Sequence, residues 1–173
     1  YWNLKYTEEI SDINFAKKKL IQLFEDSVEK MLVADVPVGV FLSGGIDSSS
    51  VVATAKKFKP DLQTFTAGFN DPSDEFKYAK KMADHFNTPH NEVIIDYQDM
   101  TKNFEKILYH MDEPILDPAI FPLFFASKLA KQKIKVGLLG EGADELFAGY
   151  SKYNILNNFF WKRYLKADRV FIK

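Results

Sequence analysis

One stretch of the sequence decides the fold, Val38-Gly39-Val40-Phe41-Leu42-Ser43-Gly44-Gly45-Ile46-Asp47-Ser48-Ser49. Its first five residues form a short apolar run rich in strand formers, which is typical of a strand buried on both faces of a parallel sheet. Two glycines then interrupt the run, and a helix is expected from Asp47 to Phe58. The stretch therefore predicts a strand, a glycine turn and a helix in direct succession.

Strands and helices alternate along the rest of the chain. Further strands are expected at 62–69, 91–95 and 136–139, and helices at 11–31, 73–86, 99–111, 121–131 and from 144 onward. This alternation predicts an α/β domain with three layers, α/β/α, around a mainly parallel sheet with right-handed crossovers. Ligands of such sheets bind beyond the carboxyl ends of the strands, and here glycine-rich loops follow Leu42 and Leu139.

The composition excludes several classes of function. The 173 residues are 46% hydrophobic and 27% charged, as in a globular domain, and the net charge of −1 gives no field that would attract nucleic acid or an anionic membrane. The chain has no cysteine, so disulfides, thiolate nucleophiles and cysteine-ligated metals are excluded within it. No apolar run reaches the roughly 20 residues that span a bilayer, and nothing reads as a secretion signal, so the cytoplasm is the expected location.

The segment from Tyr150 to Lys173 is rich in aromatic residues that fall on more than one helical face. A helix that is apolar around much of its circumference needs cover on several sides. The segment is therefore either a core helix of this domain or a helix covered by sequence or a partner outside the chain.

The loop from Ser43 to Ser49 has the groups that hold a pyrophosphate. Gly44 and Gly45 leave backbone N–H groups accessible, and the helix that follows offers its N-terminus to negative charge. Side-chain hydroxyls that can add hydrogen bonds come from Ser43, Ser48 and Ser49. Asp47 would repel a pyrophosphate unless a divalent cation lies between them, so it indicates Mg²⁺ as well as a nucleotide.

The loop could also be a plain Gly-Gly turn in which Asp47 caps the helix. Its position between a buried strand and a helix favours the phosphate-binding interpretation. It is not a Walker A loop, because no Gly-Lys-Ser/Thr occurs, and it lacks the Gly-x-Gly-x-x-Gly spacing of dinucleotide-binding folds.

A second glycine-rich loop, Gly140 to Tyr150, follows the last expected strand. Glu141, Asp144 and Glu145 concentrate negative charge there, and neighbouring carboxylates need compensation by a cation. Asp144, expected on the same side of the sheet as Asp47, could complete the Mg²⁺ site. The alternative is an acidic helix N-terminus that the helix dipole favours.

These two loops resemble those of a known family. Ser43 to Ser49 resembles the PP-loop of ATP pyrophosphatases, and the approach from Val36 to Leu42 is similar to that of the asparagine synthetases in particular. Gly140 to Glu145 resembles their Gly-Glu-Gly-x-Asp-Glu region. Further matches are Tyr1-Trp2, Asp112-Glu113-Pro114, Asp117-Pro118 and Ser127-Lys128-Leu129-Ala130. The resemblance covers nearly the whole chain to about Tyr150 and weakens afterwards.

The resemblance implies an adenine nucleotide alpha hydrolase-like fold and an amide-forming ligase. Family members use ATP to adenylate the side-chain carboxylate of aspartate and release pyrophosphate, and ammonia then displaces AMP to give asparagine. The acyl-adenylate supplies the leaving group that a carboxylate lacks, and Mg²⁺ offsets charge on the departing pyrophosphate. The implied partners are aspartate and ammonia, which a glutaminase domain releases from glutamine, with no nucleic acid, no membrane and a homodimer left open.

The resemblance also assigns site residues by position. The pyrophosphate would be held by Ser43, Gly44, Gly45, Asp47, Ser48 and Ser49. The AMP would be lined, largely through backbone groups, by Phe41, Leu42, Ala67, Leu139 and Gly140, with Tyr150 a weaker candidate. Asp47 and Asp144 would bind Mg²⁺, and Glu141 would position the ammonia or take a proton from it.

The chain departs from the family pattern in three ways. Leu139 stands where many members carry serine, so one hydrogen bond to the nucleotide is absent or replaced. The family's N-terminal glutaminase domain is not expected within these 173 residues, and without a cysteine they cannot hydrolyse glutamine by the family's route. The family's catalytic lysine lies downstream of the matched region, and no lysine after Tyr150 can be assigned to it. Residues 1–173 are therefore expected to be a single, partial ATP-binding domain of the asparagine synthetase type.

Two alternatives stay open beside the asparagine-forming ligase. An amidotransferase or cyclase that activates another carboxylate would share these loops, and the residues that contact the acceptor would distinguish the two. A nucleotide-binding fragment without turnover is favoured by Leu139 and by the missing lysine. The intact Asp47 and Asp144 oppose it, since a structural relic needs no divided Mg²⁺ site.

Overall fold

The computed structural model describes residues 3, 10–69, 71, 75–113 and 117–153. They fall into two compact units, Tyr1–Leu139 and Gly140–Lys173. The first unit contains the sheet and the loop Ser43 to Ser49, and the second contains the acidic loop. Most of the aromatic segment, residues 154–173, lies outside the described residues, so both interpretations of it stay open.

The helices and strands follow the predicted order. In the first unit they are α1 (Ile13–Met31), β1 (Val38–Phe41), α2 (Ile46–Phe58), β2 (Gln63–Gly68), α3 (Phe76–His85), β3 (His90–Ile94), α4 (Tyr97–Tyr109), α5 (Ile120–Ala130) and β4 (Val136–Leu138). The second unit contains α6 (Ala143–Phe147). Boundaries differ from the predicted ones by a few residues, and the predicted start of α3 at Ser73 and Asp74 lies outside the described residues. The helix α4 begins earlier than predicted because the Asp96 side chain caps it by accepting from the N–H of Asp99 at 2.6 Å.

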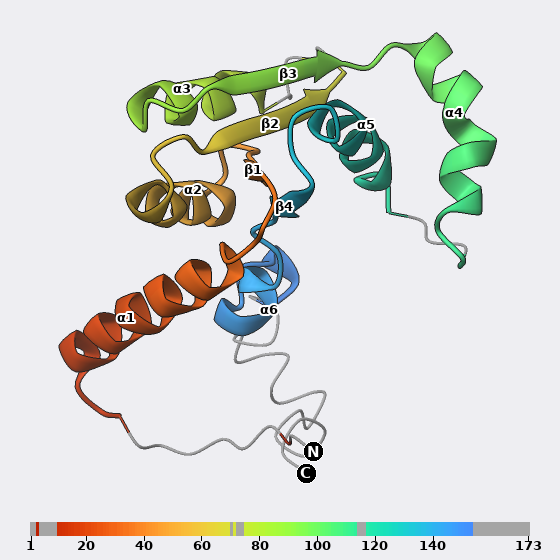
Figure 1. The fold of residues 1–173 in the computed structure, drawn as a ribbon. Coiled ribbons are helices and arrows are strands. Elements are labelled where there is room, and N and C mark those ends of the chain that lie inside the picture. Colours follow the sequence, from red (N-terminus) through yellow and green to blue (C-terminus); the bar gives the residue numbers. More distant parts are fainter. Residues whose placement is uncertain (1–2, 4–9, 70, 72–74, 114–116, 154–173) are drawn as a thin grey trace, which may run out of the picture. The chain divides into compact units, whose positions relative to one another are not determined.

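The four strands pair in the order β3-β2-β1-β4, and all of them are parallel, which confirms the predicted parallel sheet (Figure 1). Phe41 pairs with Phe65 across β1 and β2, and Val40 pairs with Leu138 across β1 and β4. From β1 the chain moves outward through β2 and β3 and then returns to the other side of β1 as β4. The strand order therefore reverses between β1 and β4, and sheets of this kind bind ligands beyond the carboxyl ends of the strands at such a reversal.

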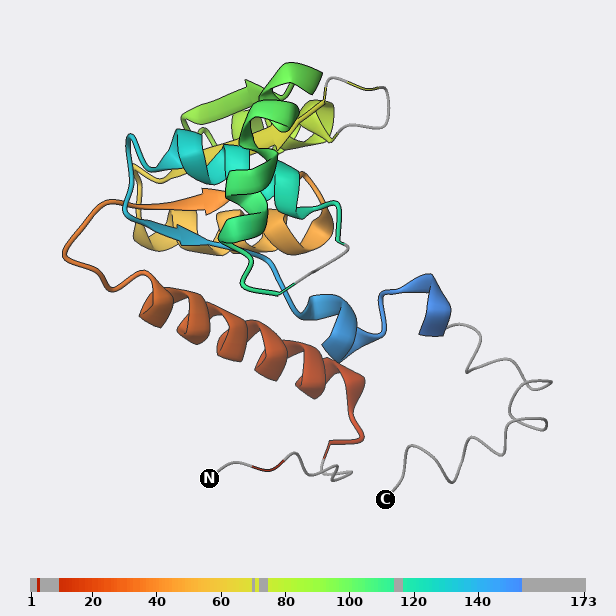
Figure 2. The ribbon, with the colours of Figure 1, turned by 90° about the vertical axis from the view of Figure 1, so that its right-hand side faces the viewer.

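Helices cover both faces of the sheet, which confirms the predicted three layers (Figure 1 and Figure 2). One face of β1 packs against α1, α2 and α3 in a core that includes Val28, Val40, Leu42, Val52 and Ala83. The opposite face of the sheet packs against α4 and α5 through Phe65, Ile107, Phe125 and Ala130. Among the described helices, none combines the length and the apolar character that crossing a bilayer requires.

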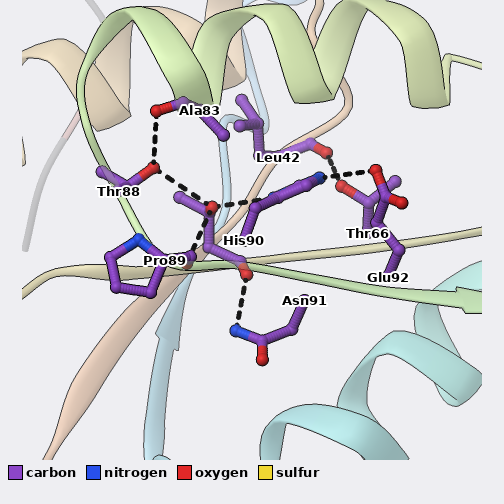
Figure 3. Close-up of polar contacts among 9 residues, drawn as sticks. Leu42, Thr66, Ala83, Thr88, Pro89, His90, Asn91 and Glu92 are labelled. Carbon is purple, nitrogen blue, oxygen red and sulfur yellow. Dashed lines mark hydrogen bonds and ion pairs between the residues drawn. The ribbon is translucent and has the colours of Figure 1, made fainter.

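A polar cluster lies between β2 and β3, on the face that α3 covers (Figure 3). The hydroxyl of Thr64, which is completely buried, lies 2.8 Å from Nδ1 of His90 and 3.4 Å from the Thr88 hydroxyl. Nε2 of His90 lies 3.2 Å from Oε1 of Glu92. Burial lowers the pKa of His90 below its usual value of 6.5, and this effect outweighs the opposing influence of Glu92 and Asp84.

We expect His90 to make the stability of the first unit depend on pH. The unfolded chain binds a proton on this imidazole near pH 6.5, and the folded chain binds it only at lower pH. The contribution of neutral His90 is therefore complete above the unfolded pKa and is lost progressively as the pH falls from there through the lower folded pKa. At about pH 7.5 the wild-type protein should have a larger free energy of unfolding than His90→Gln. This difference should be smaller at about pH 5.5.

Chemical denaturation at several pH values measures this difference. His85→Gln is the matched control, because His85 is exposed at the end of α3. A difference between wild type and His90→Gln that stays constant across this pH range would contradict the prediction.

Candidate functional site

The loop after β1 is held closed by two serine side chains. The N–H of Ser43 donates to Oγ of Ser48 at 3.2 Å, and the two hydroxyl oxygens lie 2.9 Å apart. The N–H of Gly45 donates to Oγ of Ser43 at 3.2 Å. Two of the three hydroxyls that were predicted to face a phosphate thus also hold the loop in its own conformation.

Gly44, in the middle of the loop, lies against the helix α3. Its φ is +85°, a value that L side chains rarely adopt. A Cβ at this position would lie 2.4 Å from the backbone nitrogen of Ala79 and 2.5 Å from the carbonyl carbon of Tyr78. Glycine is therefore required here for two independent reasons, and the close approach places α3 directly behind the loop.

The helix α2 begins at the end of this loop with free N–H groups. Its N-cap, Gly45, has an extended backbone, and no described side chain caps the first turn. The N–H groups at the start of a helix lack intrahelical partners, and together with the helix dipole they attract an anion. Asp47 lies in this first turn and is partly exposed. Its carboxylate is the type of ligand that Mg²⁺ takes together with phosphate oxygens, so the donor set fits a metal-bound nucleotide.

Ser49 contributes a buried hydroxyl that has no partner in the part of the chain that the structure describes. The residue is 7% exposed, and no atom among the described residues hydrogen-bonds to its Oγ. A buried hydroxyl left unpaired costs about 1–3 kcal/mol, and such groups in native folds usually have a water or a ligand as partner. The hydroxyl of Ser49 is thus a buried donor without a partner among the described residues, and its contact with a phosphate stays a prediction.

The ends of β1 and β2 offer mainly backbone atoms to a ligand. Phe41 packs against Phe65, with ring centroids 6.4 Å apart, and Leu42 is 1% exposed. The N–H of Leu42 donates to the carbonyl of Phe65 at 2.9 Å, and the carbonyl of Leu42 accepts from the hydroxyl of Thr66. Ala67 is partly buried in the cluster between the sheet, α4 and α5. These side chains pack in the core, and a contact of this segment with AMP through its backbone groups stays a prediction.

The second unit holds the acidic loop around α6. Gly142, immediately before the helix, has a φ of +88°. A Cβ at Gly149 would lie 1.8 Å from Oδ1 of Asp144, so the turn after the helix closes over the Asp144 carboxylate. Asp144 is partly exposed, whereas Glu141 is fully on the surface of this unit.

Glu145 and Tyr150 form a local pair that the sequence did not indicate. The hydroxyl of Tyr150 donates to Oε1 of Glu145 at 2.7 Å. This hydrogen bond lowers the pKa of Glu145 and raises the pKa of Tyr150 to about 12. The hydroxyl of Tyr150, a predicted contact of the AMP, is therefore bonded within its own unit.

The structure divides the predicted site residues between the two units. The first unit brings together, at the carboxyl ends of β1 and β2, Phe41, Leu42, Ser43, Gly44, Gly45, Asp47, Ser48, Ser49 and Ala67. Leu139, 43% exposed, is the last residue of this unit, and the second unit holds Gly140, Glu141, Asp144 and Tyr150. Within the described parts of the chain, no three histidine or acidic side chains gather into a metal site. The joint Mg²⁺ site of Asp47 and Asp144 stays a prediction.

Two contacts of the loop have no signal in the sequence. The approach of α3 to Gly44 and the hydrogen bond from Thr66 to Leu42 both join residues that lie far apart along the chain. Neither Ala79 nor Thr66 belongs to a motif, and only the folded arrangement of the strands and helices reveals their part in the site.

Comparison with known proteins matches nearly the whole chain to one family. The family model described as asparagine synthase matches residues 19–170. Asparagine synthetase [glutamine-hydrolyzing] 1 of Bacillus subtilis is 44% identical over 137 residues, which are 79% of this chain and 22% of that protein. Putative asparagine synthetase [glutamine-hydrolyzing] 2 of Methanocaldococcus jannaschii is 39% identical over 156 residues, which are 87% of this chain and 30% of that protein. The chain thus spans less than a third of the length of these relatives.

A solved structure supports the fold. The NH3-dependent NAD synthetase from Campylobacter jejuni superposes with a TM-score of 0.50 at 16% sequence identity, covering 78% of this chain and 60% of that protein. At this level of identity the likeness concerns the fold alone, and it agrees with the parallel sheet between helical layers.

We expect Gly44→Ala to damage the loop far more than Gly45→Ala. A side chain at Gly44 meets the backbone of α3 and an unfavourable φ, whereas a Cβ at Gly45 would meet only Oγ of Ser43, at 3.2 Å. Gly44→Ala should lower the free energy of unfolding by about 2 kcal/mol or more, and Gly45→Ala by less than about 1 kcal/mol. Denaturant titration measures both variants, and equal losses of stability would contradict this account of the loop.

Proposed function

The chain belongs to the asparagine synthase family, and we propose that it is the ATP-binding part of an enzyme that forms the side-chain amide of asparagine. In the first half-reaction a carboxylate oxygen of aspartate attacks the α-phosphorus of ATP, and the bond to the leaving pyrophosphate breaks. In the second, ammonia attacks the acyl carbon, a proton leaves the nitrogen, and AMP departs with the electron pair of the broken C–O bond. The products are asparagine, AMP and pyrophosphate.

The start of α2 supports this proposal most strongly. Its first turn has no side-chain cap, Gly44 is held by α3 at a φ of +85°, and Ser49 has a buried unpaired hydroxyl. These features together favour a site for a polyphosphate, because the N–H groups at the start of a helix attract an anion and the glycines leave backbone N–H groups accessible. They explain binding of the pyrophosphate part of ATP better than they explain a plain turn.

We assign further roles to the acidic residues. Mg²⁺, held by Asp47 and Asp144, would neutralise charge that develops on the leaving pyrophosphate. Glu141 would hold the attacking ammonia or accept its proton. Backbone groups of Phe41, Leu42, Ala67, Leu139 and Gly140 would line the AMP, and the ammonia would come from glutamine. The cytoplasm, where ATP and aspartate are abundant, is the proposed compartment, and a homodimer stays a prediction.

Replacing Asp47 by asparagine should weaken the binding of Mg²⁺-ATP. The substitution keeps the shape of the side chain but removes the charge that attracts a divalent cation. We expect the dissociation constant of Mg²⁺-ATP in the full-length protein to rise on the order of tenfold, and that of metal-free ATP to change little. Isothermal titration calorimetry with and without Mg²⁺ measures both constants.

Asp61→Asn is the matched control for this experiment. Asp61 is exposed in the turn between α2 and β2. This turn lies at the amino ends of the strands, whereas the loop lies at their carboxyl ends. The Asp61→Asn variant should bind Mg²⁺-ATP as the wild type does. An unchanged affinity in Asp47→Asn would remove Asp47 from the metal site.

Exchange of labelled pyrophosphate into ATP tests the proposed reaction itself. Adenylation is reversible while pyrophosphate is present, so the full-length protein should exchange label only when the correct carboxylate is supplied. We expect exchange with aspartate in the absence of glutamine and ammonia. Exchange that requires a different carboxylate would reject aspartate as the substrate, and Mg²⁺-ATP binding without any exchange would favour the fragment that only binds a nucleotide.

Glu141→Gln separates the two half-reactions. If Glu141 assists the attack of ammonia, the variant should retain aspartate-dependent exchange and lose at least about a hundredfold in asparagine formation. Equal losses in both assays would place Glu141 elsewhere in the mechanism.

A further inference from the structure

Thr66 lies in the middle of β2 and reaches across to the end of the neighbouring strand β1. Its side chain is 7% exposed, and its hydroxyl donates a hydrogen bond to the carbonyl of Leu42 (Figure 3). Leu42 is the residue that directly precedes the loop Ser43 to Ser49. Thr66 therefore contacts the backbone at the point where the strand becomes the loop.

The hydrogen bond from Thr66 fixes the orientation of a whole peptide unit, because the peptide unit is planar. The carbonyl of Leu42 and the N–H of Ser43 belong to the same peptide plane and point in opposite directions. The carbonyl accepts from Thr66, and the N–H donates to Oγ of Ser48 at 3.2 Å. The plane is thus held from both ends, by β2 on one side and by the first turn of α2 on the other. The N–H of Leu42, bonded to the carbonyl of Phe65 at 2.9 Å, holds the preceding peptide plane as well.

The orientation of this peptide plane decides how the loop continues. If the plane rotated, the N–H of Ser43 would leave Ser48, and the closed conformation in which Ser43 also accepts from Gly45 would be lost. The start of α2 would then present its free N–H groups from a loop that no longer has one conformation. A single buried hydroxyl on β2 thereby affects an anion site that it does not touch.

We propose that Thr66 is a positioning residue that orients the nucleotide-binding loop through the carbonyl of Leu42. The inference rests on the proposed binding of Mg²⁺-ATP for its effect on affinity, but its effect on the loop is independent of any ligand. Thr66 acts through the backbone of Leu42 and Ser43.

Thr64 provides a matched comparison within the same strand. It lies on the same face of β2, two residues earlier, and its hydroxyl is also buried. That hydroxyl contacts Thr88 and His90, beside β3, on the side of β2 away from β1. Loss of either hydroxyl affects the core, but only Thr66 is connected to the loop.

The test compares Thr66→Val, Thr66→Ser and Thr64→Val in the full-length protein. Valine keeps the shape of threonine without its hydroxyl, whereas serine restores the donor. We expect Thr66→Val to raise the dissociation constant of Mg²⁺-ATP roughly five- to tenfold, and Thr66→Ser and Thr64→Val to stay within about twofold of wild type. Thermal unfolding should show that both valine variants are less stable than wild type.

A second measurement needs no nucleotide. Amide hydrogen exchange of Ser43 and Gly45 in the ligand-free protein should be faster in Thr66→Val than in wild type, and unchanged in Thr64→Val. Wild-type affinity together with wild-type exchange in Thr66→Val would overturn the inference, and so would an equal loss of affinity in Thr64→Val. If the wild-type protein failed to bind Mg²⁺-ATP, the proposed function would fall, and the exchange rates would still decide whether Thr66 orients the loop.

Discussion

The parallel hydrogen-bond pairing of β1 with strands on both of its sides is the constraint on which the site depends. β2 and β4 flank β1, so the point where β1 ends is held from two directions. A loop that follows an edge strand would lack one of these supports. The order of strands reverses at β1, and sheets of this kind bind ligands beyond the carboxyl ends of the strands at such a reversal. Packing on both faces, around Val40 and Phe65, keeps the strand in place.

The loop combines rigidity with unsatisfied polar groups. Ser43 and Ser48 bond each other, Gly44 is pressed against α3, and the hydroxyl of Thr66 holds the carbonyl of Leu42. These contacts use backbone and side-chain groups that face the protein. Among the described residues, no side chain caps the N–H groups at the start of α2, and none bonds to the hydroxyl of Ser49. A preorganised set of free donors binds an anion without having to reorganise at the moment of binding, which is the physical basis of electrostatic catalysis in such sites.

The polar groups elsewhere in the sheet serve a different purpose. The hydroxyl of Thr64 forms hydrogen bonds with the hydroxyl of Thr88 and with Nδ1 of His90 in the region between β2, β3 and α3. Burial makes the protonated form of His90 costly, so this cluster links stability to pH. The same strand β2 thus carries one threonine that joins it to β3 and another, Thr66, that joins it to the loop after β1.

The sequence by itself determined the alternation of strands and helices, the parallel sheet and the position of the loop after β1. These features follow from local patterns, because an apolar run, a glycine pair and a helical period are each readable within about a dozen residues. Only the tertiary structure decided which serines hold the loop closed, that α3 lies behind Gly44, and that Thr66 reaches Leu42. The structure also shows that the hydroxyl of Tyr150, predicted as a nucleotide contact, donates a hydrogen bond to Glu145. The reason is physical: these contacts join residues whose side chains meet through sheet register and helix packing, or through a turn whose geometry the residue types alone do not specify.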